Sequence, residues 1–234
     1  MPGLEPREIL ALWEAGSAQD PARRAATLLA AARGGSPAEA AEFDVGTRDV
    51  LLAALLGSAS GGQVPACADC PGCGAVLDVP VDVAAVAALP VHEPGERLSV
   101  LVGGAEVPYR LPTTADLIAL SGCPPDRARP AVLAACLGLD PGRTPDPEMG
   151  TAVEAAMEQA APAGAIDMLV RCPDCRVDFS LPLDVPALLW AEVETQASAL
   201  LRDVHMLAAS YGWSEADVLD LSPRRRAIYL ALAG

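Results

Sequence analysis

Two short cysteine motifs constrain the fold of this chain more than any other feature of its 234 residues. The first reads Cys70-Pro-Gly-Cys73 and the second reads Cys172-Pro-Asp-Cys175, 102 residues later. Both motifs continue into one shared pattern, C-P-x-C-x(6)-P-x-D-V. Apolar residues fall at equivalent positions of the two segments, namely Leu77 and Phe179, Val79 and Leu181, and Val81 and Leu183. The repeat predicts two copies of one local structure.

The spacing of the cysteines indicates a metal site. Four thiolates in two i, i+3 pairs suit a tetrahedral zinc ion, because each tight turn directs two sulfurs at one point. We therefore expect Cys70, Cys73, Cys172 and Cys175 to bind one structural Zn²⁺ in a split zinc ribbon. Four protein thiolates leave no open position for water or substrate. Cys67 lies three residues before Cys70 and is an alternative ligand, although only the Cys70–Cys73 pair carries the repeated pattern.

A redox-active pair is the other interpretation of a CxxC motif. Thioredoxin-like chemistry places the motif at a helix N-terminus, which lowers the pKa of the thiol. Here the segments 76–83 and 177–183, which follow the two motifs, have the composition of strands. A thiol–disulfide oxidoreductase is therefore the less favoured hypothesis.

The charge of the chain argues against a nucleic-acid partner. There are 31 acidic and 16 basic residues, a formal net charge of −15 at pH 7, and one arginine cluster at 224–226. Nucleic-acid affinity depends on clustered Lys and Arg. A zinc-ribbon adaptor that binds nucleic acid or another protein complex remains the alternative hypothesis.

Neither a membrane segment nor a catalytic site is recognisable. No run of 18 apolar residues exists, and residues 1–8 lack a secretory pattern, so we expect a cytoplasmic protein without membrane insertion. His92 and His205 have no Ser, Cys or Asp partner that suggests a triad, and no phosphate-binding glycine loop is present. We expect no enzymatic activity.

Helix caps and hydrophobic periodicity predict a mixed α+β, mainly helical fold. In the helix that follows residue 44, Thr47 is the expected cap and Gly57 the expected end. Gly103-Gly104 predicts a hairpin between residues 97–102 and 105–111. The expected order is an N-terminal helical segment (1–60), a split zinc ribbon (61–84 and 164–186), an inserted segment of a hairpin and helices (85–163) and a C-terminal helical tail (187–234).

The C-terminal tail concentrates residue types that dominate protein–protein contacts. The candidate partner-binding residues are Tyr211, Trp213, Leu219, Arg225, Arg226 and Tyr229. The alternative is that Tyr211, Trp213 and Leu219 only hold two helices together.

The pattern of the tail resembles a known family. It reads Leu207-Ala-x-x-Tyr211-Gly-Trp213-x-Glu215-x-x-Val218-Leu219-x-Leu221-x-x-x-Arg225-Arg226-x-x-Tyr229. This is similar to the C-terminal signature of baseplate hub assembly chaperones of T-even-type contractile phages and related contractile injection systems. The segments 45–49 and 109–117 and the CPxC motifs resemble further blocks of those proteins. The resemblance implies a non-enzymatic assembly or structural role in a phage-tail-like particle, with baseplate or hub proteins as partners.

Overall fold

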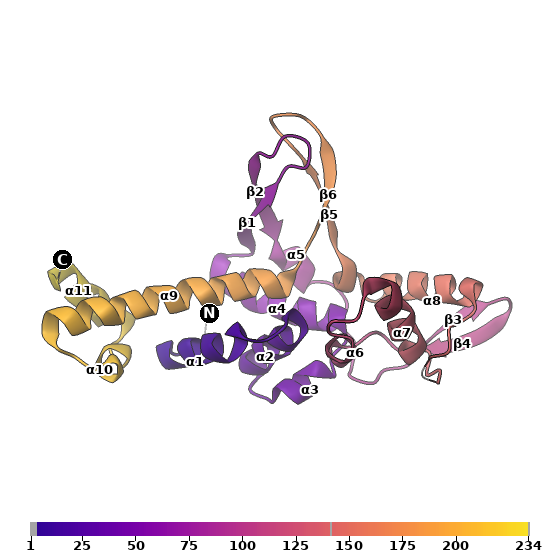
Figure 1. The fold of residues 1–234 in the computed structure, drawn as a ribbon, viewed down its shortest axis with the longest axis horizontal. Helices are drawn as coiled ribbons and strands as arrows, with labels where there is room; N and C mark the ends of the chain where they lie inside the picture. Colours follow the sequence, from indigo (N-terminus) through magenta and orange to yellow (C-terminus); the bar gives the residue numbers. More distant parts are fainter. Residues whose placement is uncertain (1–3, 141, 234) are drawn as a thin grey trace. The chain divides into compact units, whose positions relative to one another are not determined.

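The computed structural model describes residues 4–140 and 142–233, apart from the side chains of residues 59 and 60. The chain forms two compact units, and both are drawn in Figure 1. Unit 1 combines the chain up to Ala18 with the chain from Ala187 onward, and unit 2 spans Gln19–Pro186. Helices predominate, and the strands form small antiparallel pairs, so the fold is the mixed, mainly helical α+β fold that the sequence predicts.

Unit 1 brings the first helix together with the C-terminal helices. Its elements are α1 (Pro6–Ser17), α9 (Val185–Tyr211, which begins at the end of unit 2), α10 (Glu215–Leu219) and α11 (Pro223–Ala233). The core consists of Ile9, Leu10, Ala197, Leu200 and Leu219. The first helix therefore belongs with the tail, whereas the sequence grouped it with residues 1–60.

A glycine in α1 permits close packing inside unit 1. A Cβ atom at Gly16 would lie 2.5 Å from a ring carbon of Trp190 on α9. The helix α1 passes this glycine and continues to Ser17. The glycine therefore acts as a point of contact with the Trp190 ring and not as a helix stop.

The helices at the start of unit 2 are α2 (Pro21–Arg33), α3 (Pro37–Ala41) and α4 (Val45–Ser60). One expectation for α4 is wrong: its cap is Asp44, whose carboxylate accepts the backbone N–H of Thr47 at 2.9 Å. Thr47 is buried, and its hydroxyl instead accepts the backbone N–H of His92 at 2.8 Å. The helix also passes Gly57 and ends at Ser60, where Gly61 adopts the left-handed conformation with φ of +71°.

The inserted segment is a hairpin packed with helices. Its elements are α5 (Val83–Ala87), β3 (Leu98–Val102), β4 (Ala105–Tyr109), α6 (Thr114–Ala119), α7 (Pro125–Cys136), α8 (Pro147–Ala160) and the 3₁₀ turn η1 (Pro162–Ala165). The expected hairpin is confirmed: Val102 lies opposite Ala105, and Gly103 and Gly104 have φ of +58° and +84°.

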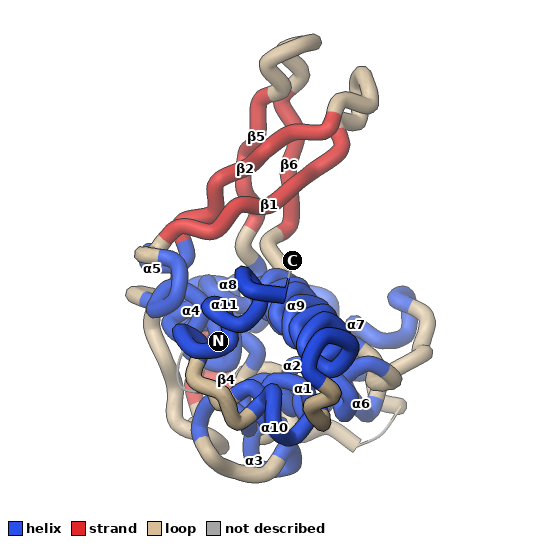
Figure 2. Tube along the Cα trace, turned by 90° about the vertical axis from the view of Figure 1, so that its left-hand side faces the viewer, coloured by secondary structure: helices blue, strands red, loops and turns tan. Residues whose placement is uncertain are grey.

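The cysteine motifs connect the strands of two further hairpins. One pairs β1 (Gln63–Asp69) with β2 (Val76–Asp82), and the other pairs β5 (Asp167–Arg171) with β6 (Asp178–Pro182). Figure 2 shows the two hairpins beside each other and projecting from the helices to which they connect. They share a core of Ala68, Cys70, Leu77, Val79 and Cys172, with Met168, Val170, Phe179 and Leu181 packed against it. We call this pair of hairpins the ribbon. The sequence missed β1.

Candidate metal centre

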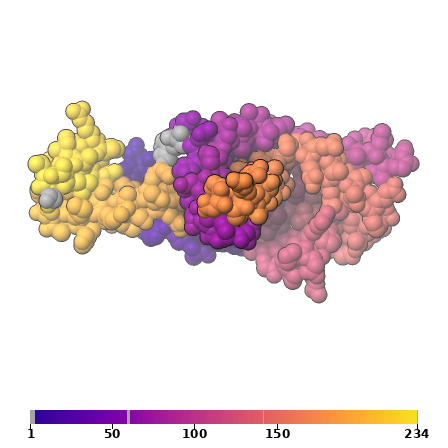
Figure 3. Space-filling view, turned by 90° about the horizontal axis from the view of Figure 1, so that it is seen from above, coloured from indigo at the N-terminus to yellow at the C-terminus, as the bar shows by residue number. Residues whose placement is uncertain are grey.

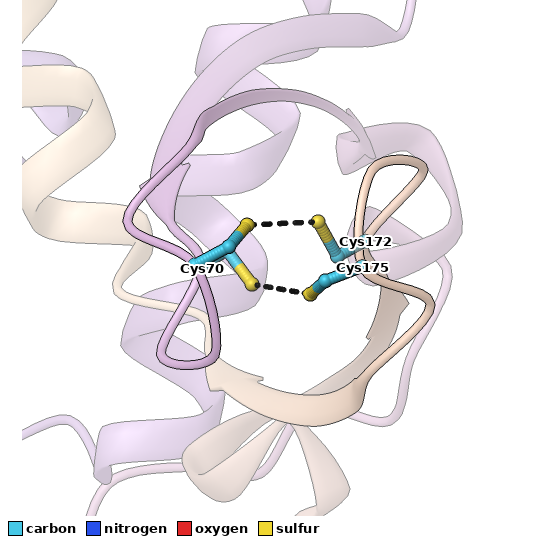
Figure 4. A group of neighbouring side chains, drawn as sticks. Cys70, Cys172 and Cys175 are labelled. Carbon is cyan, nitrogen blue, oxygen red and sulfur yellow. Dashed lines mark hydrogen bonds between the residues drawn. The ribbon is translucent and has the colours of Figure 1, made fainter.

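Four cysteine sulfurs converge where the two hairpins of the ribbon meet. The Sγ atoms of Cys70 and Cys175 are 3.5 Å apart, and those of Cys73 and Cys172 are 3.7 Å apart (Figure 4). All four sulfurs lie within 4.8 Å of one another. A tetrahedral ion with metal–sulfur bonds of about 2.3 Å holds its sulfurs about 3.8 Å apart. The spacing therefore suits one tetrahedral ion, and both close pairs join one hairpin to the other.

The two motifs fold into the same turn. In each motif the residue after the second cysteine donates its N–H to the carbonyl of the first cysteine: Gly74 to Cys70 at 2.9 Å, and Arg176 to Cys172 at 2.9 Å. Both donors are in the left-handed region, with φ of +73° and +63°. Glycine adopts this conformation freely, whereas an arginine pays about 1 kcal/mol for it. The repeated sequence pattern thus encodes a repeated backbone turn.

The glycine inside the first motif lets the second hairpin approach. A Cβ atom at Gly72 would lie 3.2 Å from a methyl of Val177 and 3.3 Å from the sulfur of Cys175. The backbone N–H of Gly72 also donates to the sulfur of Cys70 at 3.4 Å. Such N–H groups stabilise a thiolate before any metal arrives.

The four cysteines differ in burial and in pKa. Cys70 and Cys172 are buried and Cys73 and Cys175 are exposed, so the centre lies between the ribbon core and solvent. Burial opposes ionisation of Cys70, but the backbone N–H groups of Cys73 and Gly72 and the neighbouring thiols outweigh it and lower its pKa to about 7.

The same neighbours act in the opposite direction on Cys73. The backbone N–H of Ala75 favours its thiolate, but the sulfurs of Cys175 and Cys70 dominate and raise the pKa of Cys73 to about 12. Adjacent negative charges repel one another, so a cation bound between the sulfurs would favour the thiolate form of both cysteines.

The fifth candidate ligand lies outside the cluster. Cys67 is exposed on β1, and its thiol contacts a carboxylate oxygen of Asp78 at 3.7 Å. Within residues 4–140 and 142–233, the cysteine group with metal-binding geometry consists of the other four. Of the remaining thiols, Cys136 is fully buried, and burial raises its pKa to about 11 despite the nearby Arg110 guanidinium. A thiol of this kind is chemically inert.

The candidate partner-binding residues of the tail divide into surface and interior. Tyr211 and Trp213 stack with ring centroids 4.8 Å apart, and Tyr229 packs edge-on against Trp213 at 4.8 Å. Leu219 is a core residue of unit 1. Arg226 is also buried, in an ion pair with Asp203 at 3.1 Å, whereas Arg225 is exposed.

The aromatic cluster therefore fastens the end of α9 to α11. Its partly exposed rings, together with Arg225, remain available as a surface. Leu219 and Arg226 act inside unit 1, because a buried side chain makes its contacts within the fold.

The two histidines lie in different surroundings. The ring of His92 contacts the carbonyl of Ala160 through Nε2 at 3.0 Å and Glu96 through Nδ1 at 3.2 Å. Burial lowers the pKa of His92, but these two acceptors outweigh burial and raise it. His92 thus joins its loop to the end of α8, and His205 is exposed on α9.

Within the described residues, no helix has both the length and the apolar character needed to cross a membrane. Comparisons with protein-family models, curated proteins and solved structures gave no match to this chain.

Proposed function

We propose that Cys70, Cys73, Cys172 and Cys175 bind one structural Zn²⁺ that fastens the two hairpins of the ribbon. The observation that carries this proposal is the pairing of sulfurs across the hairpins, at 3.5 and 3.7 Å. A four-sulfur tetrahedral site favours zinc, and iron is the principal competitor for such a site. All four positions are occupied by protein, so the metal has no open site for catalysis.

The energetics favour a structural role. Closing a loop of about 100 residues, the separation of the two motifs, costs about 4 kcal/mol in chain entropy. Binding of zinc to thiolate-rich peptides releases about 10–16 kcal/mol at pH 7. Isolated two-stranded hairpins are only marginally stable in water. The ion therefore offsets the closure and supports strands that have a small core of their own.

Elemental analysis of the protein purified without added metal tests this assignment. We expect one zinc per chain, and cobalt substitution should give the absorption bands of a tetrahedral four-thiolate centre. A metal-free protein with a Cys70–Cys73 disulfide that is reversibly reduced would instead support the oxidoreductase hypothesis. One iron per chain would support the four-cysteine site but would show that its ion is not zinc.

We further propose that the protein is a non-enzymatic assembly or structural component of a contractile injection particle, with baseplate or hub proteins as partners. The support is the resemblance of the tail and the closed four-cysteine geometry. The surface residues Tyr211, Trp213, Tyr229 and Arg225 are the candidates for partner contact. The protein would act in the cytoplasm, either transiently or as part of the assembled particle.

Co-purification with tail proteins encoded beside it tests the assembly proposal. We expect binding to a baseplate or hub protein that Arg225→Ala weakens and Arg127→Ala, an exposed arginine of α7, leaves intact. No binding to any of these proteins, and absence from sheath–baseplate fractions, would refute it. Retention of nucleic acid at low salt would favour the adaptor hypothesis instead.

A further inference from the structure

The strand edges of the ribbon differ in their capacity to accept another strand. In an antiparallel pair, alternate residues direct their N–H and C=O groups away from the partner strand. The bonds from Cys172 to Val177 and from Leu183 to Ile166 fix this alternation for β5 and β6. Asp167, Leu169 and Arg171 therefore direct their backbone groups outward along β5, and no strand among the described residues pairs with this edge.

Each of the other three ribbon strands has a proline at an outward position. The bond from Cys70 to Ala75 sets the alternation of the first hairpin and places Pro65 and Pro80 at outward positions of β1 and β2. Pro182 occupies an outward position of β6. Proline has no N–H to donate and is a common device for protecting edges. Of the four ribbon strands, β5 alone has no proline.

The side chains of β5 make its open edge self-complementary. Their burial pattern alternates, and the side chain of Leu169 is 83% exposed on the face opposite the ribbon core. Two antiparallel copies of β5 centred on Leu169 would place Leu169 against Leu169 and Asp167 against Arg171, twice by symmetry. Three residue pairs would each exchange two backbone hydrogen bonds.

We propose that β5 is a docking edge for a second copy of this chain, with the two β5 strands antiparallel across a two-fold axis at Leu169. The edge strand β3 provides the contrast. It exposes Leu101 at 75%, but its other outward residue is Ser99, so two copies of β3 have no acid–base pair to align them. Because the β5 edge is short, the association is weak and concentration-dependent.

Charge reversal tests the pairing directly. Sedimentation velocity on the metal-loaded full chain should show a monomer–dimer equilibrium. Asp167→Arg places two arginines opposite each other at both symmetric positions. Arg171→Asp does the same with two aspartates, and it also removes the ion pair of Arg171 with Asp178 inside the hairpin, at 3.8 Å. Each variant alone should raise the dimer dissociation constant about tenfold or more. An equimolar mixture of the two variants should form a heterodimer, because every cross-strand pair is again opposite in charge.

A proline variant tests the backbone part of the proposal. Leu169→Pro removes an outward N–H that has no role within the hairpin, as Pro65 and Pro80 do in β1 and β2. It should abolish the dimer, and Leu101→Pro at the outward position of β3 should leave it intact. A wild-type chain that is monomeric at every attainable concentration would overturn the proposal. So would a dimer that survives Leu169→Pro, or single variants that do not associate when mixed.

Discussion

Replacing Cys172 by serine tests the central physical claim, that one ion holds the ribbon together. The substitution removes one of four thiolates and leaves the rest of the motif in place. Sharing about 10–16 kcal/mol of binding free energy among four sulfurs assigns about 3 kcal/mol to each. That value corresponds to a loss of about a hundredfold in metal affinity. The free energy of unfolding of the ribbon should fall by a similar amount at a fixed metal concentration.

Burial adds a second cost at this position. Cys172 is fully buried, whereas Cys175 is exposed. A serine hydroxyl without a hydrogen-bond partner in the interior costs about 1–3 kcal/mol. We therefore expect Cys172→Ser to destabilise the ribbon more than Cys175→Ser, although both lose one ligand. The difference between the two variants isolates burial from metal binding.

Metal competition titrations and amide hydrogen exchange measure both effects. In Cys172→Ser, the amides of β1, β2, β5 and β6 should lose protection, and those of α2 and α4 should keep it. Cys67→Ser is the matched control, because Cys67 is an exposed cysteine three residues before Cys70 and outside the cluster. Unchanged metal affinity and unchanged strand protection in Cys172→Ser would refute the proposal that one ion holds the ribbon together.

Three further predictions follow from the geometry. Metal affinity should rise with pH, because the thiols must lose protons to bind the ion. The pKa of Cys70 is about 7, so calorimetry should show that metal binding releases one proton fewer well above pH 7 than well below it. Gly46→Ala should destabilise unit 2 by about 1–2 kcal/mol in denaturant titrations, since its Cβ would lie 2.9 Å from that of Ala161. Gly57→Ala in the same helix has 3.4 Å of space and should be neutral or stabilising. His92→Ala should lower the free energy of unfolding by about 1–2 kcal/mol, and the loss should be largest at acid pH. The raised pKa of His92 makes its contribution complete below its ordinary pKa of 6.5, and the contribution is lost as pH rises through the folded value.

Helix starts and tight turns could be predicted from the sequence, because residues close together in the chain determine them. Asp20, Ser36 and Thr113, which are residue types that favour helix N-caps, begin helices because each side chain accepts a backbone N–H within three residues. The two cysteine motifs were recognisable for the same reason. Their spacing and the following Pro-x-Asp-Val reflect one turn and one hairpin, formed twice.

Features decided by distant contacts were not predictable in the same way. The strand β1 contains Pro65 and three small residues, Ala66, Cys67 and Ala68, so its composition is weak for a strand, and pairing with β2 determines its structure. The periodicity of α1 shows that one face is buried but does not identify the partner, which is α9. The sequence likewise does not identify the contacts of Leu219 and Arg226, because both residue types occur in protein–protein interfaces as well as inside folds.

The repeated pattern has a physical explanation that involves both ends of each hairpin. Its cysteines lie at the metal end, and its Asp-Val lies at the opposite end, where Val83 and Val185 are fully buried. Asp82 also caps α5 by accepting the N–H of Ala85 at 2.9 Å. Each hairpin is therefore anchored to the helices at one end by a buried valine, and the proposed ion would anchor the other end. The apolar residues between these ends form only a small core, so the two shared features of the repeat hold each hairpin at both of its ends.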